Sequence, residues 1–124
     1  MKNNKLIAAF LNTSNTNNYH SDFNALMIAI EKIEGTSVNG YTWTTTEDKT
    51  PVEFQFTVEI SGAQCMVCRD VSPQYYGTEI DFLKLYDCRN KSKIDAMYLA
   101  VVSFIKWYNR QTKLKCFNNP NHLN

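Results

Sequence analysis

Strict alternation of apolar and polar residues between Pro51 and Ile60 constrains the fold of this chain more than any other feature. Apolar side chains occupy every second position, and Glu, Gln or Thr stand between them. A period of two predicts a β-strand with one buried and one solvent-facing side. Ser61-Gly62 follows as a tight-turn signal, and Ala63–Arg69 returns as the hairpin partner. A sheet with one apolar face needs a covering layer, so helices are expected elsewhere in the chain.

Three helices are predicted to supply that layer. Lys2–Leu11 carries its apolar residues on one side, and Ser21 is the expected N-cap of a second helix that ends at Gly35. The third helix is capped by Ser92 and is expected to run to about Gln111. A single apolar stripe follows the third helix: Ile94, Met97, Tyr98, Val101, Ile105 and Tyr108.

Two further segments complete the expected sheet. Tyr41–Thr46 is rich in aromatic and β-branched residues, and Glu79–Tyr86 is a candidate fourth strand. The prediction is an α+β fold with a three- or four-stranded antiparallel sheet and helices packed on it, in the order helix, helix, strands, helix. The helices can cover one face of the sheet or both. Residues 1–116 are expected to form one domain, and residues 117–124 an Asn-rich, frayed tail.

Composition excludes several classes of protein. A chain of 124 residues, 44% hydrophobic and 20% charged, fits one globular domain with its own core. Two Trp, seven Tyr and seven Phe are too many for a disordered chain. No apolar run reaches the roughly 18 to 20 residues that span a bilayer, and no secretion signal is recognisable. We therefore expect a protein of the reducing cytoplasm without a membrane partner.

Cysteine spacing raises the question of a metal. Cys65 and Cys68 have the spacing of half a zinc site, but the sequence holds no second pair of this kind. The pair falls in a predicted strand, where residues three apart point to opposite faces, so the two sulfurs should diverge. The prediction is buried, free thiols, with neither a metal nor another cofactor.

The net charge of +1 hides an asymmetry along the chain. Residues 89–116 contain seven basic residues and one acid, a sum of +6, so residues 1–88 sum to −5. An end this basic is compatible with an anionic partner. The candidate binding residues are Arg89, Lys91, Lys93, Lys106, Trp107, Arg110, Lys113 and Lys115.

Helical geometry turns part of this region away from the predicted core. At about 100° per residue, Lys106, Arg110 and Lys113 lie about 100 to 160° from the apolar stripe, and Trp107 lies near 220°. Exposed cations can bind phosphates, and an exposed indole beside them can stack on a base. The same surface can instead bind a protein. Alternatively, cations near the end of a helix only complement its dipole. Secondary candidates for an interface, or for a lid packed over the core, are Trp43, Tyr75 and Tyr76.

Both ends of the chain resemble a family of small phage proteins. Asn4–Phe10 resembles its "NKLIAEF" opening, residues 19–34 resemble its "YHxSW…LMPVVEKIE" block, and Lys93–Asn109 resembles its "KIEAVYxAVVEFIKWYN" ending. These are features of the phage ABA-sandwich domain, found mostly in phages and prophages of Bacteroidota. Phe23 stands where that family commonly has Trp. The resemblance implies a sheet between helix layers and brings no catalytic residues with it.

The expected function follows from this resemblance and from the motifs. The sequence contains no P-loop, GxGxxG or HExxH motif, so we expect no enzyme and no small-molecule substrate. The resemblance implies a phage or prophage interaction protein in the bacterial host cytoplasm. One role is inhibition of host defence, as an anti-CRISPR protein that binds an effector nuclease or its guide RNA. A charge of +1 argues against nucleic-acid mimicry, which needs a large negative field. The alternative is a phage regulatory or nucleic-acid-binding module without a defence role.

Overall fold

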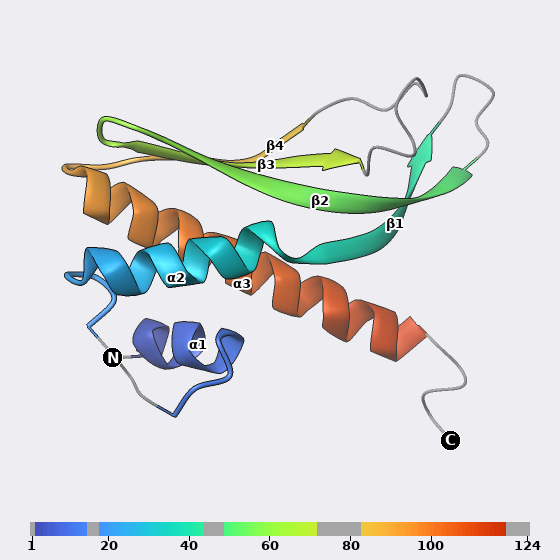
Figure 1. Ribbon diagram of the computed structural model, residues 1–124. Coiled ribbons are helices and arrows are strands. Elements are labelled where there is room, and N and C mark those ends of the chain that lie inside the picture. The colour runs from blue at the N-terminus through green and yellow to red at the C-terminus, as the bar shows by residue number, and fades with distance from the viewer. Residues whose placement is uncertain (1, 15–17, 44–48, 72–82, 119–124) are drawn as a thin grey trace.

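In the computed structural model, the described residues form a four-stranded antiparallel sheet and three helices (Figure 1). The structure describes residues 2–14, 18–43, 49–71 and 83–118. The α+β class and the packing of helices on the sheet are confirmed. In chain order the elements are α1 (Lys2–Phe10), α2 (Phe23–Glu34), β1 (Ser37–Trp43), β2 (Lys49–Ser61), β3 (Gln64–Val71), β4 (Leu83–Arg89) and α3 (Lys93–Asn118).

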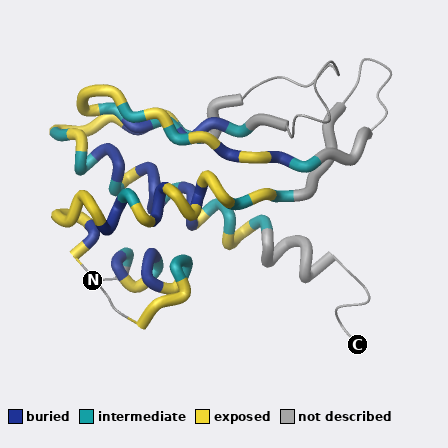
Figure 2. The backbone as a smooth tube through the Cα atoms, viewed as in Figure 1, coloured by how far each residue is buried: buried dark blue, intermediate teal, exposed yellow. Residues whose placement is uncertain are grey.

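The sheet is a meander in which each strand pairs with its neighbour in sequence, in the order β1-β2-β3-β4. The predicted hairpin is confirmed, because Ser61 pairs with Gln64 across a two-residue turn. Gly62 at the first turn position has a φ of +56°, whereas Ala63 keeps a negative φ, the pattern of a type II′ turn. Burial alternates along β2, where Phe56 is buried and Thr57 exposed (Figure 2).

Element boundaries differ from the expected ones by a few residues. β1 starts at Ser37 rather than Tyr41, and β4 covers Leu83–Arg89 rather than Glu79–Tyr86. The N-cap of α2 is Asp22 rather than Ser21: the Asp22 carboxylate accepts a hydrogen bond of 3.1 Å from the Ala25 backbone N–H. A carboxylate at this position also complements the positive end of the helix dipole.

Helix α3 is longer than predicted. It continues to Asn118 instead of ending near Gln111. The apolar stripe ends at Tyr108, but no Gly or Pro occurs between Gln111 and Pro120. The residue that precedes a proline disfavours the α conformation. Pro120 is therefore the first residue after the stripe that forces the helix to end, and α3 ends two residues before it.

All three helices lie on the same side of the sheet (Figure 1). α2 and α3 pack directly on the strands, and α1 packs on α3. The sheet between two helix layers, which the resemblance implied, is therefore corrected: the helices that the structure describes all lie on one face of the sheet. The physical reason is visible on β2, whose outward residues Gln55, Thr57 and Glu59 are exposed and polar, and so offer no apolar surface to a second layer.

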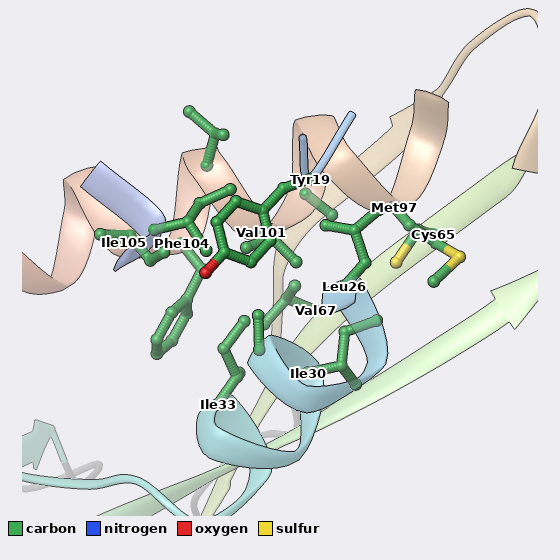
Figure 3. Close-up of a cluster of buried hydrophobic side chains, with 14 of the residues drawn as sticks. Tyr19, Leu26, Ile30, Ile33, Cys65, Val67, Met97, Val101, Phe104 and Ile105 are labelled. Carbon is green, nitrogen blue, oxygen red and sulfur yellow. The ribbon is translucent and has the colours of Figure 1, made fainter. Parts of the chain in front are cut away.

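The core fills the space between α2, α3 and the sheet (Figure 3). Leu26 and Ile33 enter it from α2, Val67 from β3, and Val101 and Phe104 from α3. Tyr19, in the loop before α2, is 1% exposed and closes this cluster on the side away from the sheet strands. The predicted burial of Val101 is confirmed, since 1% of it is exposed.

Candidate functional site

Helix α3 is packed on two sides. On the sheet side, the Phe104 ring lies 4.9 Å from the Phe56 ring in an edge-on arrangement. On the other side, Phe10 of α1 contacts Tyr108, with 5.9 Å between ring centroids. The apolar stripe seen in the sequence is therefore only part of a wider buried arc. A narrow solvent-facing arc remains on the helix.

Trp107 belongs to the packed arc, which corrects the prediction that it lies off the core. The indole is half-buried and lies 5.6 Å from the Phe56 ring and 5.7 Å from the Phe104 ring, measured between centroids. Phe104 and Trp107 lie outside the stripe and contact Phe56 of the sheet, so the packed side of α3 is wider than the stripe. An indole held between β2 and α3 is occupied by packing and is a poor platform for stacking a base.

The solvent-facing arc of α3 carries Leu99, Lys106 and Arg110, which we call the basic edge. All three side chains are exposed, Leu99 to 41%. Lys106 and Arg110 stand four residues apart, so their cationic heads are neighbours on the helix surface. Among the described residues, neither forms an ion pair. The predicted exposure of the two cations is confirmed, and their role in binding stays a prediction.

A surface hollow lies beside the basic edge, between α1 and α3. Its volume is about 360 Å³, and Asn3, Lys5, Leu6 and Lys106 line it. The two helices are held in register by a 3.2 Å hydrogen bond that the Tyr98 hydroxyl donates to Asn4. Asn4 is only 4% exposed, whereas Tyr98 is half-buried, so this contact is partly shielded from solvent.

The other predicted basic residues do not join this edge. Arg89, Lys91 and Lys93 lie at the turn from β4 into α3, and Lys93 precedes Lys106 by about 20 Å of helix. Arg89 also has a partner, because its Nε lies 3.9 Å from the Asp87 carboxylate. Lys113 and Lys115 belong to α3, and Trp43 to β1, but their side chains lie outside the described residues, as do Tyr75 and Tyr76 entirely.

Two cations were missed by sequence reasoning. Arg69 lies with its guanidinium carbon 4.4 Å from the centre of the Phe54 ring, and burial lowers its pKa. The alternation of β3 could have indicated its inward position, since Cys65 and Val67 share that side. Lys5 gives no comparable signal, because only tertiary packing brings α1 beside Lys106.

The described cysteines are all buried, free thiols. Cys65 belongs to the main core cluster, and Cys68 is buried outside it, next to a shift in the strand register. Cys65 and Cys88 face each other across β3 and β4. Burial raises the pKa of the Cys65 thiol to about 12, and the nearby Cys88 adds to the rise. The described residues include no group of three or more His, Cys, Asp or Glu that could hold a metal ion.

Comparisons with protein-family models, with curated proteins and with solved structures found no match to this chain. Of the helices that the structure describes, none combines the length and apolar character needed to cross a bilayer. The basic edge and the neighbouring hollow are thus the features on which a functional proposal rests.

Proposed function

We propose that this chain is a non-enzymatic interaction protein whose basic edge binds an acidic surface of a partner protein. The observation that carries the proposal is the pair Lys106 and Arg110, two exposed cations one helical turn apart with no ion pair among the described residues. Like charges at this spacing destabilise a helix by about 0.2 to 0.5 kcal/mol. Carboxylates of an acidic partner would attract both cations and so offset the repulsion between Lys106 and Arg110.

The apolar component favours a protein over a nucleic acid as the partner. Leu99 is exposed on the same arc as the two cations, and Leu6 lines the adjacent hollow. Arg is enriched in protein interfaces, and their buried centre is apolar. A nucleic-acid site would profit from an exposed aromatic ring, but Trp107 is packed against Phe56.

The biological setting of this proposal comes from the resemblance to small phage proteins. We propose a phage or prophage protein that acts in the bacterial cytoplasm as an inhibitor of host defence. The partner would be an effector protein, such as an RNA-guided nuclease. The alternative, a regulatory module that binds RNA or DNA, draws its support from the net charge of +6 over residues 89–116.

Charge reversal at the basic edge tests the proposal. Lys106→Glu with Arg110→Glu should fold normally, because both side chains are exposed, and should reduce capture of the partner from host lysate at least tenfold. Lys91→Glu with Lys93→Glu is the matched control, since it changes the net charge equally at the far end of α3. Capture is quantified by mass spectrometry, with and without RNase.

The outcomes separate the two candidate functions. Partners that are lost with the edge variant, kept with the control and insensitive to RNase support a protein interface. Capture that RNase abolishes supports the nucleic-acid alternative. Equal capture by the wild type and the folded edge variant contradicts any binding role for Lys106 and Arg110.

A further inference from the structure

The hollow between α1 and α3 combines an apolar floor with cationic rims. Leu6 is half-buried and contributes hydrocarbon surface, and Lys5 and Lys106 bring their aliphatic stems and ammonium groups from two different helices. Among the described residues, none that lines the hollow is acidic. Among the described residues, neither lysine forms an ion pair.

The hollow is large enough to admit one large side chain. Its volume of about 360 Å³ lies near the lower end of the range of about 300 to 1,000 Å³ seen for pockets that hold small molecules. A hydrocarbon floor gains little from a phosphate or a sugar, which prefer water or hydrogen-bonding groups. It gains from an aliphatic or aromatic side chain, whose burial is worth about 25 cal/mol per Å² of apolar surface.

The walls of the hollow are held in place before any partner binds. Tyr98 of α3 donates a hydrogen bond to Asn4, which directly follows Asn3 and precedes Lys5. Phe10 at the end of α1 contacts Phe104, with 6.1 Å between ring centroids. A site whose walls are already ordered loses less conformational entropy on binding.

We infer that this hollow binds a large apolar side chain that acidic residues flank, on an exposed segment of a partner protein. The apolar side chain would rest on Leu6, and carboxylates on either side would pair with Lys5 and Lys106. This inference rests on the proposed function and names the chemistry of the partner: an acidic peptide with one apolar anchor.

A synthetic peptide provides the direct test. The probe is a fluorescein-labelled peptide in which one Phe stands between two runs of three Glu. The control probes replace Phe by Ser, replace every Glu by Gln, or are a single-stranded oligouridylate. Fluorescence anisotropy with the full chain should show the parent peptide binding at least tenfold more tightly than each control probe.

Variants then locate the binding to the hollow. Lys5→Glu and Lys106→Glu should each weaken peptide binding at least fivefold, whereas Arg110→Glu, outside the hollow, should have a smaller effect. Asn3→Trp fills the hollow without changing the charge and should also weaken binding at least fivefold, with its melting temperature measured to confirm folding.

The results separate this inference from the proposed function. If the peptide does not bind while the edge variant still loses the captured partner, the inference is wrong and the proposed function stands. If oligouridylate binds with the same dependence on Lys5 and Lys106, the partner is a nucleic acid and both are overturned. Equal binding of the Phe and Ser peptides overturns the apolar anchor.

Discussion

Val101 shows how strictly a single position of α3 is constrained. It is 1% exposed in the core between the helices and the sheet. Val101→Asp should lower the free energy of unfolding by more than about 3 kcal/mol, because an unpaired carboxylate would lie in an apolar interior. The matched control is Leu99→Asp, two residues away and exposed to 41%. Thermal or urea unfolding measures both, and similar stabilities would show that the stripe is not core.

The burial of Cys65 should make the free energy of unfolding depend on pH. Its folded-state pKa is raised to about 12, chiefly by burial, whereas an unfolded thiol ionises near about 8.5. Between these values the unfolded chain binds fewer protons than the folded one, so the free energy of unfolding falls as pH rises. Below about pH 8 this thiol contributes no pH dependence.

Urea unfolding of the wild type and Cys65→Ala between pH 7 and pH 11 measures that contribution. The wild type should lose stability more steeply than the variant above about pH 9. Groups that titrate in this range without contacting Cys65 are shared by the two proteins and cancel in the comparison, whereas the neighbouring Cys88 thiol belongs to the measured difference. Parallel curves would mean that the Cys65 thiol ionises equally well in both states.

At the scale of an element, the start of α2 offers a paired test. Asp22→Ala removes the carboxylate that accepts from the Ala25 N–H and should cost about 1 kcal/mol. The neighbouring Ser21→Ala should cost only a few tenths, because the Ser21 hydroxyl bonds the Asn18 carbonyl in an exposed turn, at 3.3 Å. Equal losses in equilibrium unfolding would show that both side chains cap the helix.

An element can be predicted from the sequence when the residues that determine it lie within the element itself. The β2–β3 hairpin follows from alternation and a turn glycine, both of which lie within the segment itself. The end of α3 was missed because an apolar stripe marks where a helix is packed, not where its backbone stops. The positions of Trp107 and Lys5 were missed because each depends on a neighbour distant in sequence, Phe56 for Trp107 and α3 for Lys5.

At the scale of the whole molecule, Trp107 joins the sheet to α3. Trp107→Ala should lower the free energy of unfolding by about 2 kcal/mol or more, since its indole packs against Phe56 and Phe104. Trp107→Phe should retain most of the stability by keeping an aromatic ring in the same space. Thermal melting checks both. A stable, folded Trp107→Ala that loses partner binding would restore a direct binding role for the indole.

The one-sided arrangement of helices could not be predicted from element order alone. Two early helices and one late helix can cover one face of the sheet or both. Which of these forms depends on whether the outward face of the sheet is apolar. On β2, the outward residues Gln55, Thr57 and Glu59 are polar and exposed, so this strand offers no apolar surface to a second layer. The alternation of β2 therefore indicated a single layer of helices, although the family resemblance indicated a second one.

The uncovered face of β2 also has a consequence for how this sequence can change over generations. Phe54 and Phe56 are buried, whereas Gln55, Thr57 and Glu59 are exposed. Substitutions at the outward positions should be nearly neutral for folding, so they can accumulate freely. Related chains should therefore diverge at every second residue of this strand, and a saturation mutagenesis scan should show tolerance that oscillates with a period of two.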